Sequence, residues 1–174
     1  NLEGWGGPNP DSWYQQQEAL QKKIVSRMRE LGIEPVFPGY AGMVPRNIGE
    51  KLGYQIADPG TWCGFPRPAF LSSEDEHFDS FAAMYYEELE KLYGKAKYYS
   101  MDPFHEGGNT EGVDLAKAGT SIMKAMKKAN PEAVWVIQAW QVNPRPAMID
   151  VLNAGDMLVL DLYSEKRPQW GDSD

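Results

Sequence analysis

The chain alternates helix-like segments with short apolar runs, and this order is the feature that most limits its fold. Apolar residues at helical spacing predict helices over residues 11–31, 74–94, 115–130 and 146–155. Strands are predicted over residues 33–42, 96–101, 133–140 and 156–165. The strand-like runs are apolar throughout rather than alternating, as expected of parallel strands covered on both faces. The order therefore predicts an α/β fold built on a parallel sheet.

The first predicted helix has a clear apolar stripe and clear ends. A cap of Asp11 and Ser12 precedes it, and Gly32 ends it. The residues at helical spacing are Trp13, Leu20, Ile24, Met28 and Leu31. We expect this stripe to face other elements of the fold.

A long segment, residues 41–73, separates the first predicted strand from the second helix. It is rich in Gly and Pro and has too little periodicity to predict an element of its own. Loops of this length in compact domains are usually functional or disordered. Because this one contains Trp62, Phe65 and Phe70, we do not expect it to be freely solvated.

Two architectures agree with the predicted order of elements. One is an open, doubly wound sheet, and the other is part of an eight-stranded (β/α) barrel, which four strands cannot close. No Gly-rich phosphate-binding motif follows any predicted strand, so nothing favours a nucleotide-binding sheet. In both architectures, active groups lie at the carboxyl ends of the strands.

Charge and composition exclude several classes of partner. The net charge of −8 argues against nucleic acid, which requires a clustered basic surface. No window is long and apolar enough to span a bilayer. The lone Cys63 excludes an internal disulfide. The chain begins without Met or a signal peptide, so we expect it to be cut from a longer protein whose export signal would lie elsewhere.

Polar and aromatic residues gather at the carboxyl ends of the last three predicted strands. These residues are Asp102, His105 and Glu106, then Gln138, Trp140 and Gln141, then Asp161, Tyr163 and Glu165. The chain is also rich in aromatic residues, with 6 Trp and 9 Tyr. Sugars stack their apolar faces on aromatic rings and form charge-assisted hydrogen bonds to carboxylates through their hydroxyls. The pattern therefore suggests a carbohydrate site.

Other interpretations of the same residues stay open. Glu106 could simply accept backbone hydrogen bonds from the glycine turn that follows it. Asp102, His105 and Glu106 could bind a metal, but His77 is the only other histidine, so that site would depend on carboxylates. A nucleophilic Cys63 paired with a histidine has no supporting motif. We expect neither a metal nor another cofactor.

Five segments, taken in order, resemble the family 89 glycoside hydrolases, the alpha-N-acetylglucosaminidases. They are "NLEGWGGPNPDSWYQQQEALQKKIVSRMRELGIEPVFPGYAGMVP", "GTWCGF", "YYSMDPFHEGG", "AVWVIQAWQ" and "LVLDLYSE". The resemblance covers nearly the whole chain. The catalytic domain of that family is a (β/α)8 TIM-like barrel, so the resemblance implies that residues 1–174 are its N-terminal to central part, roughly half of the barrel.

The resemblance also implies a catalytic residue. Family members are retaining enzymes that remove terminal alpha-linked N-acetylglucosamine with two glutamates, and the acid/base glutamate falls on Glu106. The neighbouring residue is commonly Asn in animal members and is His105 here, which resembles bacterial members. The nucleophile of the family lies beyond the end of this chain. We therefore expect the isolated chain to be inactive.

Residues that bind the sugar follow from the same resemblance. The pocket tryptophans fall on Trp5, Trp62 and Trp140, and Asp161 and Tyr163 fall on the rim. An alternative is a carbohydrate-binding module without catalysis, which would use the same tryptophans. The acidic charge favours a neutral, mucin-type glycan over a heparan-type one. The chain has no N-glycosylation motif, in keeping with a bacterial origin, and the family suggests an exported protein.

Overall fold

A computed structural model describes residues 9–104 and 108–168 of the 174-residue chain. Its helices are α1 (Asp11–Glu30), α2 (Ile48–Leu52), α3 (Phe78–Tyr93), α4 (Leu115–Ala129) and α5 (Pro146–Ile149). Its strands are β1 (Val36–Pro38), β2 (Met43–Val44), β3 (Ile56–Ala57), β4 (Thr61–Trp62), β5 (Phe65–Pro66), β6 (Ala69–Leu71), β7 (Tyr98–Ser100), β8 (Val134–Ala139) and β9 (Met157–Asp161). Each helix and strand predicted from the alternating pattern is present, and most are shorter than predicted.

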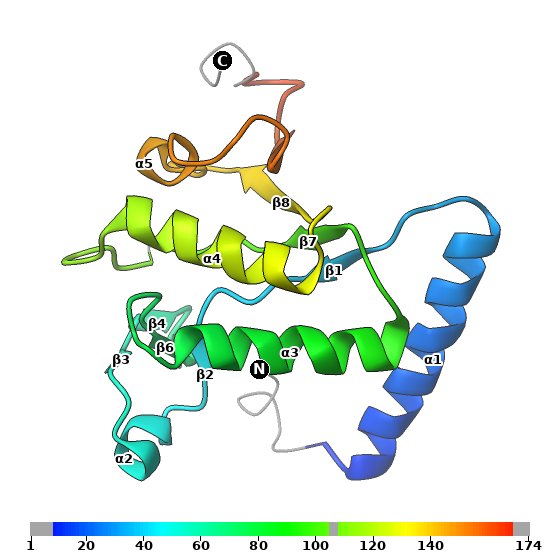
Figure 1. The fold of residues 1–174 in the computed structure, drawn as a ribbon, viewed down its shortest axis with the longest axis horizontal. Coiled ribbons are helices and arrows are strands. Elements are labelled where there is room, and N and C mark those ends of the chain that lie inside the picture. Colours follow the sequence, from blue (N-terminus) through cyan, green and yellow to red (C-terminus); the bar gives the residue numbers. More distant parts are fainter. Residues whose placement is uncertain (1–8, 105–107, 169–174) are drawn as a thin grey trace.

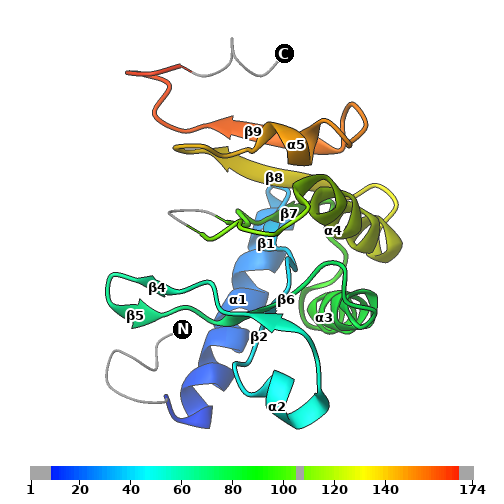
Figure 2. The ribbon, with the colours of Figure 1, turned by 90° about the vertical axis from the view of Figure 1, so that its left-hand side faces the viewer.

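A parallel sheet organises the fold, as the sequence predicts. Its strand order is β1-β7-β8-β9, and each neighbouring pair is parallel. The helices α3 and α4 lie side by side against it (Figure 1). Because the strands are parallel, their carboxyl ends share one edge of the sheet, and Figure 2 shows β8 and β9 ending on the same side.

The core forms where α3 and α4 meet the sheet. Trp135 and Ile137 of β8 are buried together with Ile122 and Met126 of α4. The indole Nε1 of Trp135 donates a 2.9 Å hydrogen bond to the carbonyl of Met101, which satisfies its one polar atom. These residues account for the apolar strand and helix patterns of the sequence.

The first helix departs from the prediction in two respects. Pro10 occupies the capping position and α1 shows no side-chain cap, so the predicted cap of Asp11 and Ser12 is wrong. The carbonyl of Pro10 instead accepts the Trp13 amide at 2.9 Å. Of the predicted apolar stripe, Leu20, Ile24 and Leu31 are exposed, while Val25 is the buried residue of this helix.

The prediction that residues 41–73 contain no element is also wrong. This segment contains β2, α2 and β3 to β6, and we call residues 43–71 the insert. The insert forms an antiparallel sheet of order β2-β6-β3 and a separate β4–β5 hairpin. Each of its strands has only two or three residues, too few to produce a periodic pattern.

Candidate functional site

The carboxyl ends of β8 and β9 bring three of the predicted sugar-binding residues together. Asp161 is the last residue of β9 and lies opposite Ala139 of β8. Trp140 follows directly after β8, and its ring meets that of Tyr163 edge to face, with centroids 6.2 Å apart. An exposed phenol, a half-buried indole and a half-buried carboxylate thus line one edge of the sheet.

Asp102 connects the end of β7 to β8 through hydrogen bonds. Its Oδ1 accepts the backbone amide of Gln138 at 2.8 Å, and its Oδ2 accepts the side-chain amide of Gln138 at 3.3 Å. Both carboxylate oxygens therefore hold the two strands in register next to the site. This role competes with the interpretation of Asp102 as a metal ligand. The other two residues of that possible metal site, His105 and Glu106, lie outside the described part of the chain.

The described residues on either side of residues 105–107 approach each other closely. They are Phe104, which has a φ of 63°, and Gly108. A Cβ on Gly108 would lie 2.5 Å from the Cα of Phe104, a distance that no real side chain tolerates. Gly108 is therefore required by close backbone contact, which gives the second glycine of the Gly-Gly pair a structural reason.

The hairpin β4–β5 presents two aromatic side chains. Trp62 and Phe65 are cross-strand partners, so their side chains lie on the same face of the hairpin, and they are 50% and 41% exposed. Cys63 and Gly64 form the two-residue turn, with φ angles of 50° and 80° as in the type I′ turns of tight hairpins. The pattern Trp-Cys-Gly-Phe was the sequence signal for this hairpin, and Phe65 is a candidate site residue that our sequence analysis missed.

The insert contacts the chain that follows β7. Its strand β6 contributes Phe70, whose ring centroid is 6.0 Å from that of Phe104. In Figure 2 the hairpin projects from the same side of the molecule as the carboxyl ends of β8 and β9. The hairpin that carries Trp62 and the strand that precedes Trp140 thus approach this side from two different parts of the fold.

Unusual backbone angles are concentrated at this edge. Among the described residues, the non-glycine residues with positive φ are Cys63, Phe104, Gln141 and Tyr163. One lies at the hairpin turn, and each of the others closely follows the end of β7, β8 or β9. Such conformations cost about 1–3 kcal/mol each and tend to cluster at functional sites, which agrees with the choice of this edge as the candidate site.

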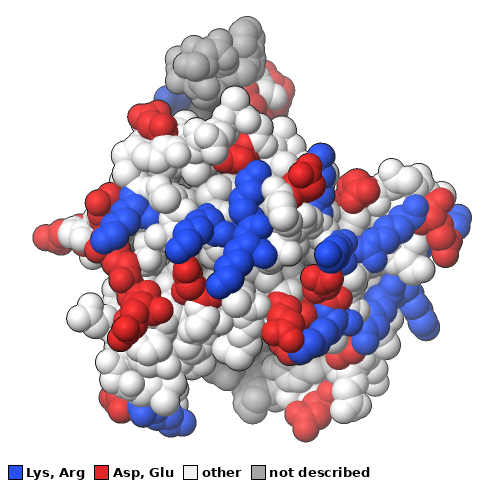
Figure 3. Space-filling view, in the orientation of Figure 1, with Lys and Arg blue, Asp and Glu red and all other residues white. Residues whose placement is uncertain are grey.

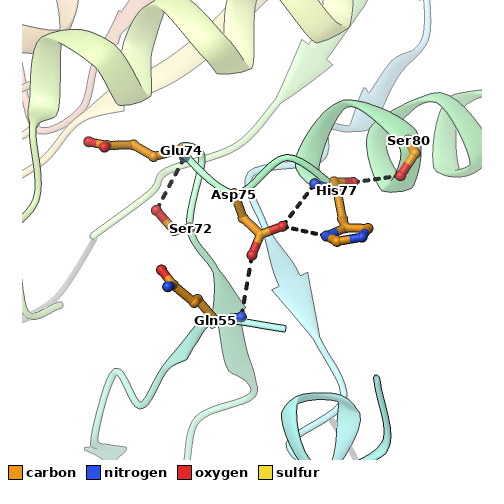
Figure 4. A network of polar contacts seen from close by, with 6 residues as sticks. All are labelled: Gln55, Ser72, Glu74, Asp75, His77 and Ser80. Atoms are coloured by element: carbon orange, nitrogen blue, oxygen red, sulfur yellow. Dashed lines mark hydrogen bonds and ion pairs between the residues drawn. The ribbon is translucent and has the colours of Figure 1, made fainter. Parts of the chain in front are cut away.

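The remaining predicted residues fall elsewhere or outside the described chain. Trp5, His105 and Glu106 lie in the residues that the structure does not describe. His77 lies at the start of α3, where its Nδ1 is 2.8 Å from Asp75 (Figure 4). Its ring also stacks on that of Tyr54, with centroids 4.0 Å apart. His77 is thus engaged in holding the insert to α3, which leaves the Cys63 nucleophile alternative without support from this histidine.

The end of β1 contributes to the core rather than to the rim. Tyr40 is buried between Phe78 and Tyr85, with ring centroids 5.5 and 5.6 Å away. Burial raises the pKa of Tyr40 well above its ordinary value, so this phenol stays neutral. The role of Tyr40 is therefore packing within the core.

Residues 9–104 and 108–168 contain neither a metal-binding cluster nor a membrane-spanning helix. Within these ranges no group of three or more His, Cys, Asp or Glu side chains is placed to hold a metal ion. Nor does any helix there have the length and apolar character needed to cross a membrane.

Comparisons with known proteins identify the family of the chain. The sequence model of the alpha-N-acetylglucosaminidase (NAGLU) tim-barrel domain matches residues 1–174. Human alpha-N-acetylglucosaminidase is 32% identical over an alignment of 184 positions, which covers 97% of this chain and 25% of that protein. The chain thus spans about a quarter of this curated relative.

Solved structures extend the similarity to the backbone. A family 89 glycoside hydrolase from Clostridium perfringens, in complex with 2-acetamido-1,2-dideoxynojirmycin, is 41% identical with a TM-score of 0.91 over 97% of this chain and 20% of that chain. A variant from the same organism with two Glu→Gln substitutions, in complex with its substrate GlcNAc-alpha-1,4-galactose, is 40% identical with a TM-score of 0.92 and the same coverage. The chain belongs to the alpha-N-acetylglucosaminidase family, glycoside hydrolase family 89, and corresponds to its tim-barrel domain.

Proposed function

We propose that the complete protein containing this chain is a retaining glycosidase that removes terminal alpha-linked N-acetylglucosamine. The observation that carries the proposal is the edge where Trp140, Asp161 and Tyr163 meet, at the carboxyl ends of β8 and β9. Strand β8 pairs with β7, the strand after which Glu106 follows in the sequence. Membership of the alpha-N-acetylglucosaminidase family supports this choice of sugar. The Clostridium perfringens complex, in which two glutamates are replaced and the substrate is bound, supports a chemistry that depends on two glutamates.

The side chains at this edge suit the recognition of an N-acetylglucosamine unit. The Trp140 and Tyr163 rings, with Trp62 from the hairpin, offer apolar faces on which a pyranose stacks. The carboxylate of Asp161 can accept hydrogen bonds from sugar hydroxyls. His105, next to Glu106, would orient the acid/base group, and Trp5 would complete the pocket.

Glu106 would act as the general acid and then as the general base. It would first donate a proton to the glycosidic oxygen while a second glutamate, supplied by chain outside these residues, attacks the anomeric carbon from the opposite face. The ionised Glu106 would then remove a proton from the water that releases the sugar. Retaining enzymes hold the two carboxyl groups about 5–5.5 Å apart, so the missing strands must bring the nucleophile to this same edge.

The fold proposal follows from the open edges of the sheet. We infer that β1, β7, β8 and β9 are four strands of an eight-stranded barrel, roughly half of it. Exposed apolar side chains support this: Val36 lies on β1, and Leu158 and Leu160 lie on β9, the two outer strands. The exposed stripe on α1, including Leu20 and Ile24, is a surface that a further helix of the complete protein would cover.

Replacing Glu106 with Gln in the complete protein tests the function directly. Gln keeps the shape of the side chain but cannot donate the proton, so kcat for a glycan with a poor leaving group should fall about 10²–10⁴-fold. Binding of N-acetylglucosamine should persist, as measured by calorimetry. The matched control is Glu111→Gln, which changes an exposed carboxylate five residues away and should leave kcat unchanged.

Three outcomes distinguish the alternatives. Near-normal turnover by the Glu106→Gln protein would remove Glu106 from the mechanism. Sugar binding without any turnover by the complete wild-type protein would indicate the non-catalytic binding module instead. The isolated 174 residues should show no turnover, because they lack the second glutamate. Among substrates we propose a neutral, mucin-type glycan terminus in preference to a heparan-type one. We also propose that the protein is exported, as the resemblance to the family suggests.

A further inference from the structure

The contacts within the β4–β5 hairpin are too few to fix its position. Each of its strands has two residues, and Pro66 has no amide hydrogen to donate across the pair. Isolated two-stranded hairpins of any length are only marginally stable in water. Yet this hairpin must keep Trp62 and Phe65 beside the loop that follows β7 if they are to contact a sugar. Other contacts must therefore fix it.

One guanidinium group connects both ends of the hairpin. Arg46, which follows β2, donates from Nη1 to Oδ2 of Asp58 and from Nη2 to Oδ1 of Asp58, each at 3.1 Å. The same Nη2 also donates to the backbone carbonyl of Arg67. Asp58 precedes the first hairpin strand and Arg67 follows the second. The fork of Arg46 thus bridges the segment that enters the hairpin and the segment that leaves it.

Backbone contacts complete this arrangement. Oδ1 of Asp58 also accepts the amide of Gly60 at 2.9 Å, and the amide of Arg67 donates to the carbonyl of Gly60 at 2.9 Å. The hydrogen bonds from Arg46, and after them the one from Gly60, hold the pKa of Asp58 below its usual range. Asp58 is therefore ionised and accepts these donors throughout the neutral range.

The geometry of the contact matters more than its charge. The Arg46 and Asp58 side chains are 43% and 64% exposed, so water weakens their mutual attraction and a simple ion pair here would contribute little to stability. A planar fork that binds a carboxylate with two parallel hydrogen bonds fixes direction as well as distance. Its effect should therefore appear in where the hairpin lies rather than in whether the protein folds.

We propose that Arg46 and Asp58 form a clamp that positions the β4–β5 hairpin, so that Arg46 is a positioning residue acting through Trp62 and Phe65 on sugar binding. This inference rests on the proposed function, because it assumes that the hairpin contacts the substrate. The same proposal makes Phe65 a second aromatic contact with the sugar, because it lies next to Trp62 on the same face of the hairpin.

The first test follows the hairpin itself and needs no activity. In the complete protein, Arg46→Ala should increase hydrogen exchange at the Arg67 amide about tenfold, because the structure that protects it opens more often. Amides within α3 should be unchanged. Arg27→Ala is the matched control, since Arg27 makes an exposed ion pair with Glu30 on α1, away from the hairpin. Unchanged exchange at Arg67 in the Arg46→Ala protein would overturn the clamp.

The second test asks whether Arg46 acts through Trp62. In the complete enzyme, Arg46→Ala should raise KM for an alpha-N-acetylglucosaminide roughly tenfold with little change in kcat, the pattern of lost substrate binding. Arg46→Lys should recover only part of this, because an ammonium cannot reproduce the fork. In a protein that already carries Trp62→Ala, adding Arg46→Ala should change KM less than twofold. Asp58→Asn should give a smaller rise in KM. It replaces Arg46→Ala in this test if the Arg46→Ala protein does not fold.

The outcomes separate failure of the clamp from failure of the function. If the complete wild-type enzyme does not hydrolyse alpha-N-acetylglucosaminides, the proposed function fails, whatever hydrogen exchange shows at the hairpin. If it does hydrolyse them, and the effects of Arg46→Ala and Trp62→Ala on KM multiply independently, the clamp is overturned and the function stands. A fall in kcat with unchanged KM would also overturn it.

Discussion

The parallel sheet and the β4–β5 hairpin are stabilised in different ways. The sheet is held by apolar burial, with Trp135 and Ile137 of β8 in one buried cluster with residues of α3 and α4. The rest of the insert joins that cluster through Val44, Ala69 and Leu71. The hairpin strands β4 and β5 are exposed, and Arg46 bonds to Asp58 and to the Arg67 carbonyl at the two ends of the hairpin. Apolar burial thus fixes the sheet, and polar contacts hold the hairpin whose aromatic side chains we propose to contact the sugar.

Two tryptophans allow this difference to be measured with one chemical change. Trp135 is completely buried in the sheet, whereas Trp62 on the hairpin is 50% exposed. Trp135→Ala should lower the free energy of unfolding by about 3–5 kcal/mol, because it leaves a cavity and removes the hydrogen bond to Met101. Trp62→Ala should change it by less than about 1 kcal/mol while raising KM. Urea unfolding of the complete protein measures the first effect, and steady-state kinetics the second.

Equal losses of stability in these two proteins would contradict the comparison. Such a result would mean that the hairpin is packed as part of the core. An effect of Trp62→Ala on KM could then arise from damage to the fold. The pair is therefore the strongest single test of whether stability and substrate binding are divided between the sheet and the insert.

The sequence predicts the parts of the molecule that depend on apolar burial. Periodic residues such as Ile122 and Met126 are buried as their spacing in α4 requires, and the continuous apolar run of β8 identifies a covered parallel strand. The gathering of Trp140, Asp161 and Tyr163 was predicted because parallel strands place their carboxyl ends together.

The insert could not be predicted in this way. Its strands are too short to show a period, and its hairpin is held by pairs of residues that are not neighbours in the sequence, such as Arg46 with Asp58, which no local pattern reveals. The exposed stripe on α1 was predicted to face other elements, yet the surface that would cover it lies in none of the described residues. Sequence periodicity indicates that a face is apolar and does not identify its partner.

Asp75 connects the insert to the sheet region, and its loss should have an intermediate effect. Its Oδ1 lies 2.8 Å from both the backbone amide and the Nδ1 of His77, and its Oδ2 accepts the Gln55 amide at 3.3 Å (Figure 4). The side chain is only 8% exposed. Asp75→Asn should cost about 1–3 kcal/mol of stability at neutral pH, because it removes the charged acceptor that the His77 and Gln55 donors share.

The pH dependence of that loss follows from the pKa of Asp75. Burial by itself raises this pKa, but the hydrogen bonds from His77 and Gln55 outweigh it and bring it below its ordinary value. The stabilisation is therefore complete above the unfolded pKa of about 3.9 and is lost as the pH falls through the lower folded value. Wild type and Asp75→Asn should converge in stability in acid, as followed by thermal unfolding between pH 7 and 2. Glu76→Gln, at the exposed neighbouring residue, is the control. A difference that stays constant down to pH 2 would exclude this role for the carboxylate.

The smallest effect is expected where α4 meets α3 at the surface. Lys124 lies 2.9 Å from Asp79, and the two side chains are 67% and 40% exposed. Basic and acidic side chains alternate on this face rather than forming one patch (Figure 3). Exposed pairs of this kind contribute about 0.2–1 kcal/mol and are screened by salt. A double-mutant cycle of Lys124→Ala and Asp79→Ala should therefore give a coupling energy below about 1 kcal/mol that vanishes in high salt. A larger coupling that survives high salt would show that charge pairs, and not burial alone, hold the helices on the sheet. The contrast between a sheet fixed by burial and a hairpin fixed by polar contacts would then fail.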